Sequence, residues 1–160
     1  MSRGFVKEDD LEHAGTDLPE RPLSLHPNYV TPLGLRQLQQ QATELEQTRQ
    51  QLAPRKEDPV VNQKLAVVER DLRYFQARLE NAVLVDPAKQ DGDNVLFGAC
   101  VTVEDENGDT HEFRIVGEDE ADPAKGSVSH VSPLARALVG KRVGDEATVA
   151  GQAVEIVALN

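Results

Sequence analysis

The sequence predicts an α+β protein in which an antiparallel helical hairpin precedes a small antiparallel β-sheet domain with one short helix. Two apolar runs step by three and four residues, a spacing that keeps one apolar seam on one face of a helix. A segment bounded by Pro54 and Pro59 separates the runs. After residue 95 the apolar period changes to two, which is typical of half-buried strands. The first run is Leu35, Leu38, Ala42, Leu45 and Leu52, and the second is Leu65, Val68, Leu72, Phe75, Leu79 and Ala82.

The coiled-coil hairpin is predicted over residues 31–86. Thr31 and Pro32 suit a helix start, because threonine can accept a hydrogen bond from a free backbone N–H and proline lacks the N–H that would be unpaired at the first helical position. Pro54 and Pro59 interrupt helical continuity, so the tip is expected at about residues 53–59. Arms of about 20 residues are about 30 Å long, and we expect each helix to have the other as its single partner. The expected use of so narrow a rod is to carry its tip to another molecule.

The sheet domain is predicted over residues 95–160. Asn107-Gly108 is a strong hairpin signal, because a tight primed turn needs positive φ at both central residues. Ser132 and Pro133, followed by Gly140, predict a compact helix with serine as its N-cap. Four pairs of alternating apolar residues mark the strands, namely Val101 and Val103, Phe113 and Ile115, Ala147 and Val149, and Val154 and Ile156.

Two segments are predicted outside these units. Residues 1–30 combine three prolines and an acidic run with scattered apolar residues of no regular period, which indicates a flexible tail. The apolar residues of this tail suggest that part of it lies on another surface. Residues 87–94 are polar and contain Gly92, so they are predicted to be a linker.

The charge distribution narrows the class of partner. The net charge of −11 divides into −3, +1 and −9 over residues 1–30, 31–85 and 86–160. The acidic C-terminal part repels a phosphate backbone, so a basic protein partner is expected rather than free nucleic acid. No apolar run approaches the roughly 20 residues of a membrane span, and no signal-peptide stretch follows Met1. We therefore expect a cytoplasmic protein with no membrane partner.

A block of motifs in the C-terminal part identifies a resemblance to a known family. Its order and spacing resemble the GreA/GreB family of bacterial transcription elongation factors, in which R-I-V-G-x-D-E-A-D leads to S-P-I-A-R-A-L-I-G-K. Residues 76–82, Gln-Ala-Arg-Leu-Glu-Asn-Ala, look like the end of the family's second helix. The resemblance covers about residues 31–159 and leaves the tail outside. The motifs here are Phe97-Gly98-Ala99, Arg114-Ile115-Val116-Gly117, Glu120-Ala121-Asp122, and Ser132-Pro133-Leu134-Ala135-Arg136-Ala137-Leu138 with Gly140-Lys141.

This resemblance implies an FKBP-like fold for residues 95–160 and RNA polymerase as the partner. That domain would dock at the mouth of the polymerase secondary channel while the coiled coil enters the channel, so RNA and DNA would be met only through the polymerase complex. We expect a monomer that is not itself an enzyme and holds no metal or cofactor of its own. The polymerase-binding residues implied by the match lie in an acidic loop and at the start of the short helix, and they are Asp119, Glu120, Asp122, Ser132 and Pro133.

The predicted tip departs from the family pattern. In cleavage-active members two tip carboxylates help hold the second Mg²⁺ of the polymerase, which then cuts backtracked RNA. An ungapped alignment places Gln51 and Pro54 where these acids stand, and neither offers a carboxylate. Glu57 and Asp58 are therefore the candidate Mg²⁺-assisting residues, unless they form only a solvated charged turn. Two functions stay open, a factor that stimulates transcript cleavage by the polymerase and a non-cleaving regulator that occupies the channel.

Other constellations point away from intrinsic chemistry. The acidic stretch 118–122 lacks the spaced ligands and central glycine of a calcium loop, which favours a protein contact there. No histidine has a cysteine or histidine at ligand spacing. Peptidyl-prolyl isomerase activity is suggested only by the FKBP-like fold, and the few aromatic residues do not suggest the pocket that it needs. The single cysteine, Cys100, is expected to be a buried core thiol.

Overall fold

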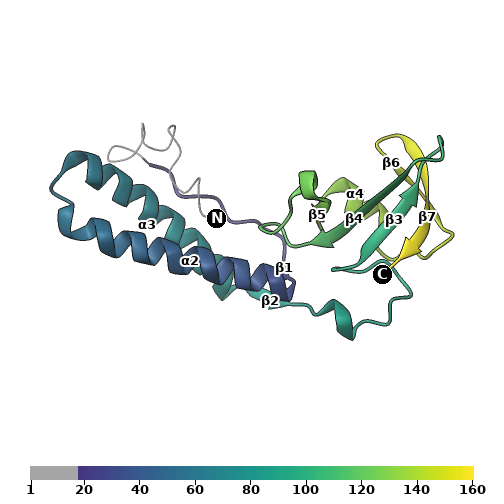
Figure 1. The fold of residues 1–160 in the computed structure, drawn as a ribbon, viewed down its shortest axis with the longest axis horizontal. Helices are drawn as coiled ribbons and strands as arrows, with labels where there is room; N and C mark the ends of the chain where they lie inside the picture. The colour runs from purple at the N-terminus through teal and green to yellow at the C-terminus, as the bar shows by residue number, and fades with distance from the viewer. Residues whose placement is uncertain (1–17) are drawn as a thin grey trace. The chain divides into compact units, whose positions relative to one another are not determined.

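The computed structural model describes residues 18–160, which form two compact units (Figure 1). The described residues of the first unit are 18–25 and 36–81, and those of the second are 26–35 and 82–160. The division lies after the first turn of α2 (Pro32–Leu52), so this helix begins in one unit and continues in the other. Residues 1–17 of the predicted tail lie outside the described part of the chain.

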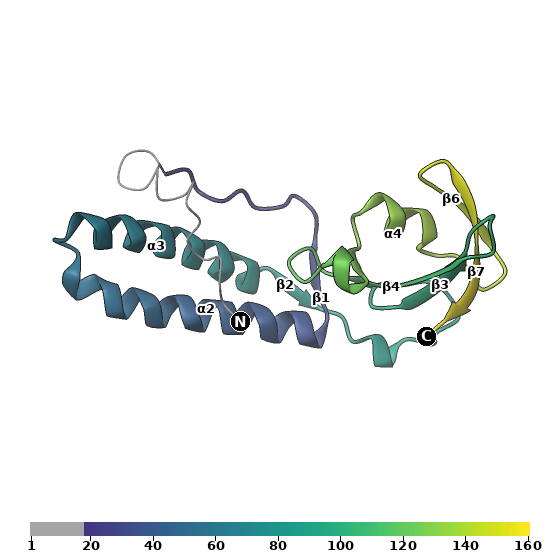
Figure 2. The ribbon, with the colours of Figure 1, turned by 45° about the horizontal axis from the view of Figure 1, so that its top comes forward.

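The first unit is built on the predicted helical hairpin. Helix α2 and helix α3 (Pro59–Glu80) lie side by side, joined through the short 3₁₀ turn η1 (Ala53–Arg55) (Figure 2). The bend therefore lies where the two prolines predicted it. The apolar seam closes at its centre, where Leu45, Val68 and Leu72 are buried. Three partly buried residues, Ala42, Leu52 and Phe75, pack against this cluster.

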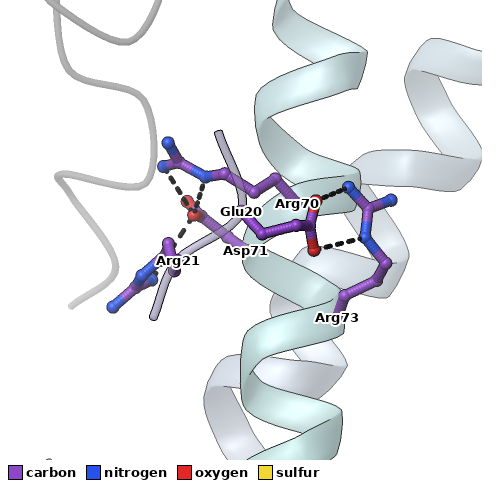
Figure 3. A network of polar contacts seen from close by, with 5 residues as sticks. All are labelled: Glu20, Arg21, Arg70, Asp71 and Arg73. Atoms are coloured by element: carbon purple, nitrogen blue, oxygen red, sulfur yellow. Dashed lines mark hydrogen bonds and ion pairs between the residues drawn. The ribbon is translucent and has the colours of Figure 1, made fainter. Parts of the chain in front are cut away.

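Helix α3 buries a second stripe, so the expectation that each helix has a single partner face is wrong for α3. Positions 67, 71 and 78 recur at helical spacing on a face separate from the seam, and Val67, Asp71 and Arg78 are all buried there, as is the adjacent Arg70. Residues 18–25 provide contacts on this side of α3, where Glu20 and Arg21 bind its polar side chains (Figure 3). Part of the predicted tail is thus an ordered segment of the hairpin unit.

The second unit contains a five-stranded sheet of order β5-β4-β3-β7-β6. The α+β class is confirmed, but the sheet is mixed rather than antiparallel, because β5 pairs parallel with β4. Helix α4 (Pro133–Leu138) contributes the buried Ala135 and Leu138 to the core. The strands are β3 (Cys100–Glu104), β4 (Thr110–Val116), β5 (Ser127–Ser129), β6 (Glu146–Val149) and β7 (Gln152–Leu159). The other buried core residues are Val95, Ala99, Val101, Val103, Phe113, Ile115, Ala147, Val154 and Ile156.

A second, two-stranded parallel sheet joins residues that the sequence assigned to the tail and to the hairpin. Strand β1 (Asn28–Val30) pairs with β2 (Ala82–Leu84). Helix α3 consequently ends at Glu80, earlier than the predicted boundary at residue 86. Asn81 is its C-cap, and the chain then enters the β1–β2 ladder instead of adding another helical turn. The predicted linker contains a further 3₁₀ turn, η2 (Pro87–Lys89).

Two local predictions need correction. Strands β3 and β4 pair antiparallel, so the predicted hairpin is confirmed, but its turn is not the tight primed turn. Residues 105–109 form a longer loop, in which Gly108 has a φ of 84° and Asn107 does not have positive φ. The Asp105 carboxylate organises this loop by accepting hydrogen bonds from the N–H groups of Asn107 and Asp109. Cys100 is half-buried rather than fully buried, and burial is the main cause that raises the pKa of its thiol.

Candidate functional site

The residues predicted to be functional lie in two places, one in each unit. Glu57 and Asp58 form the tip of the helical hairpin, between η1 and α3. Asp119, Glu120 and Asp122 lie in the loop after β4, and Ser132 and Pro133 begin α4.

The tip is an exposed turn in which one of the two carboxylates has a structural role. Asp58 is the N-cap of α3, and its Oδ1 accepts a hydrogen bond from the Val60 N–H at 3.0 Å. Glu57, Gln51 and Pro54 are exposed. Within residues 18–160, no group of three or more histidine, cysteine, aspartate or glutamate side chains could hold a metal ion. The tip therefore offers only two carboxylates, those of Glu57 and Asp58, to a metal that another molecule holds, and Oδ1 of Asp58 already accepts a backbone hydrogen bond.

The acidic loop, residues 117–122, is a compact turn. The N–H groups of Glu120 and Ala121 both donate to the carbonyl oxygen of Gly117, at 3.2 and 3.1 Å. Asp119 is exposed, whereas Asp122 is half-buried and its carboxylate lies 4.0 Å from the Lys125 ammonium. The acidic loop thus exposes Asp119 and places a cation near the carboxylate of Asp122.

Glu120 faces a different environment from the other two acids. Its Oε1 accepts a hydrogen bond from the Thr31 hydroxyl at 2.6 Å, across 89 positions of sequence. The same hydroxyl oxygen accepts the Gly34 N–H at 2.9 Å, which makes Thr31 the N-cap of α2 as predicted. Both ends of this contact lie in the second unit.

The start of α4 is linked to the acidic loop through strand β5. The Ser132 hydroxyl caps α4 by accepting the Ala135 N–H at 3.2 Å, and the exposed Pro133 occupies the first helical position. The Asp122 N–H donates to Ser127 at one end of β5, and the Ser132 N–H donates to Ser129 at the other. Because β5 has three residues, these two groups lie within about 10 Å of each other. The geometry brings the five predicted residues into one region of the second unit.

An aromatic cluster near this region was missed by the sequence analysis. The rings of Tyr29, Phe97 and His130 lie with centroids 5.3 to 5.8 Å apart, and all three are half-buried. His130 precedes Ser132 by two positions, so the cluster supports the segment that leads into α4. No sequence signal joins three single aromatic residues that are spread over about 100 positions, and only the fold brings them together.

Comparisons with known proteins point to one family. Residues 89–159 match the family described as "Transcription elongation factor, GreA/GreB, C-term". The chain is 48% identical over 86 residues to transcription elongation factor GreB of Yersinia pestis, an alignment that covers 54% of this chain and 50% of that protein. It is 44% identical over 92 residues to transcription elongation factor GreA of Hyphomonas neptunium, covering 57% and 59%. The chain therefore spans about half the length of the curated relatives that it matches.

Among solved structures, the chain is similar to GreA factor homolog 1 of Thermus thermophilus, with 21% identity and a TM-score of 0.40 over 84% of this chain and 99% of that one. It is also similar to the GreA/GreB elongation factor of Nitrosomonas europaea, with 21% identity and a TM-score of 0.39 over 83% and 98%.

Proposed function

Because residues 89–159 match the C-terminal part of the GreA/GreB family, we propose that this chain is a member of that family and a transcription elongation factor that binds RNA polymerase at the secondary channel. In this proposal the second unit docks on the polymerase and the hairpin enters the channel, where it alters elongation or the fate of backtracked complexes. Nascent RNA and DNA are met only inside the polymerase complex. The protein acts as a cytoplasmic monomer and has no catalytic activity of its own.

The observation that best supports this proposal is the grouping of the acidic loop with the start of α4. Asp119 and Pro133 are exposed, and β5 links their two segments, because it is hydrogen-bonded to Asp122 at one end and to Ser132 at the other. An exposed carboxylate beside a rigid proline at a capped helix start suits a contact with a basic protein surface. The unit carries most of the negative charge of the chain, which also favours a basic partner over nucleic acid.

The tip decides between the two forms of the function. A cleaving factor would use Glu57 and Asp58 to help hold the second Mg²⁺ of the polymerase, and the factor itself would bring no metal or cofactor. The non-cleaving regulator is the second candidate, and one observation favours it. Asp58 Oδ1 is already engaged as the N-cap of α3, so one of the two candidate ligands is partly committed to folding.

Binding of the full chain to core RNA polymerase tests the docking proposal. Replacing both Asp119 and Asp122 with Asn should weaken binding and flatten its salt dependence, because two charges leave the contact surface. The matched control replaces Asp91 and Asp93, which are exposed in the segment before the sheet, and makes the same change in net charge. Equal affinities for the two double variants at low salt would refute the assignment of the acidic loop as the contact.

Release of RNA from a backtracked polymerase complex tests the form of the function. Cleavage that the wild-type chain stimulates and that requires Mg²⁺ would support the cleaving form. If a Mg²⁺ titration gives no cleavage while the chain still alters elongation, the non-cleaving regulator is the correct description.

A further inference from the structure

Glu120 belongs to the acidic loop by sequence, but its carboxylate is bonded to the start of α2. Thr31, which is only 5% exposed, holds two hydrogen bonds through one hydroxyl group. Its oxygen accepts the Gly34 N–H, and its O–H donates to Glu120 Oε1. The Thr31 carbonyl also accepts the Leu35 N–H at 2.9 Å, so the first turn of α2 is organised around this residue.

The electrostatics of the helix start favour a carboxylate at this place. The free N–H groups of the first turn carry a partial positive charge, which acidic residues usually compensate. The first turn of α2 contains no acidic residue. Glu120 supplies the missing negative charge from a position 89 residues away, through a charge-assisted hydrogen bond in a partly buried setting.

Two glycines allow the acidic loop to approach this closely. A Cβ atom at Gly34 would lie 2.5 Å from Glu120 Oε1, and a Cβ atom at Gly117 would clash with the carbonyl oxygen of Tyr29. Both close approaches join the acidic loop to residues 29–34. The backbone is therefore shaped to let Glu120 reach Thr31, which a chance surface contact would not require.

We propose that Glu120 is a positioning residue that anchors the first turn of α2 to the acidic loop, and that it is not part of the surface that contacts the polymerase. The acidic loop then has two separate tasks. Asp119 and Asp122 face the partner, and Glu120 holds the first turn of α2, the helix that continues into the hairpin. This assignment rests on the proposed function where it removes Glu120 from the surface that contacts the polymerase. The hydrogen bond between Glu120 and Thr31 exists in the free protein and can be tested there.

Amide hydrogen exchange of the full chain, resolved at Gly34 and Leu35, tests the anchor. Glu120→Asp keeps the charge but shortens the side chain by one methylene, so the carboxylate no longer reaches the Thr31 hydroxyl. We expect exchange at these two amides to become about ten-fold faster, the change that corresponds to losing one hydrogen bond to a charged group. Asp119→Asn, the control in the same acidic loop, should leave exchange at both amides unchanged.

A second variant, Gly34→Ala, tests the same contact by a change in α2 instead of in the acidic loop. Gly34→Ala normally favours a helix by about 0.5–1 kcal/mol. Here the added methyl group displaces Glu120 Oε1, so exchange at Leu35 should become faster rather than slower. Adding Glu120→Asp to Gly34→Ala should then change little, because the contact is already lost.

Binding to polymerase separates the two assignments of Glu120. Asp119→Asn should weaken binding without changing exchange at Gly34, and Glu120→Asp should do the opposite. The proposal is wrong if Glu120→Asp leaves exchange unchanged and weakens binding as Asp119→Asn does, or if Gly34→Ala slows exchange at Leu35. A failure of polymerase binding by the wild-type chain would overturn the proposed function and leave the exchange result standing.

Discussion

Removing the Arg21 side chain should destabilise the helical hairpin, although Arg21 lies outside both helices. Its guanidinium lies 3.9 Å from the ring centroid of Tyr74. The same group lies 3.4 Å from Asp71 Oδ1 (Figure 3). Asp71 is 3% exposed and also accepts hydrogen bonds from Arg70, at 2.7 and 3.0 Å. Arg21→Ala therefore leaves a buried carboxylate with one cationic partner instead of two.

The expected cost is about 1–2 kcal/mol. A cation–π contact at a partly exposed site contributes about 0.5–1 kcal/mol, and Arg21 is 35% exposed. The Arg21–Asp71 pair adds at most about 1 kcal/mol, because its separation is long, solvent screens it, and Arg70 keeps the carboxylate paired. A loss in this range is several-fold in the equilibrium constant for unfolding, which denaturation measures easily.

Urea unfolding of the full chain, followed by helical circular dichroism, is the assay. Lys64→Ala is the matched control, since Lys64 is exposed on α3, the helix that Arg21 contacts, and the change in charge is the same. In 1 M salt the ionic part of the difference should shrink while the contact with Tyr74 persists. Equal stabilities for Arg21→Ala and Lys64→Ala at low salt would refute the conclusion that residues 18–25 help hold the hairpin.

Three further predictions concern the hairpin and its tip. Leu45→Ala should cost about 2–5 kcal/mol in urea unfolding, because Leu45 is fully buried at the centre of the seam, and a cost below 1 kcal/mol would show that the seam is misassigned. Glu57→Gln with Asp58→Asn should abolish any transcript cleavage while hairpin stability is kept, since asparagine is as good an N-cap as aspartate; full cleavage by this variant would exclude both carboxylates. The pKa of Glu20 is lowered mainly by its hydrogen bonds from Arg73, so its stabilising contribution is present above the pKa of the unfolded chain and is lost as the pH falls through the lower folded value. The stability difference between wild type and Glu20→Gln should therefore disappear in strong acid, and a difference that persists at pH 2 would contradict this.

Caps and turns show how far local sequence signals extend. Thr31, Pro32, Ser132 and Pro133 begin their helices as predicted, because an N-cap bonds to an N–H only two or three positions away. The Asn107-Gly108 dipeptide correctly predicted the hairpin between β3 and β4, but not the type of its turn. Asp105 offers its carboxylate to two amides of the loop and stabilises a longer connection than the tight turn that the dipeptide alone favours.

The sequence by itself determined the hairpin, its bend and four of the five strands of the larger sheet, because each depends on a period or a proline within a few residues. Only the tertiary structure decided which distant groups meet. Glu20 bonds to Arg73 across 53 positions and Thr31 to Glu120 across 89, and the parallel pairs β1–β2 and β4–β5 likewise join separate segments. The sequence does not show which partner a charged side chain will have, since many groups of opposite charge and many hydrogen-bond donors could pair with it. The packed backbone, with glycine where two segments touch, determines which of the possible partners a charged group meets. Glu120, which looks like a surface acid in the sequence, therefore binds the first turn of α2.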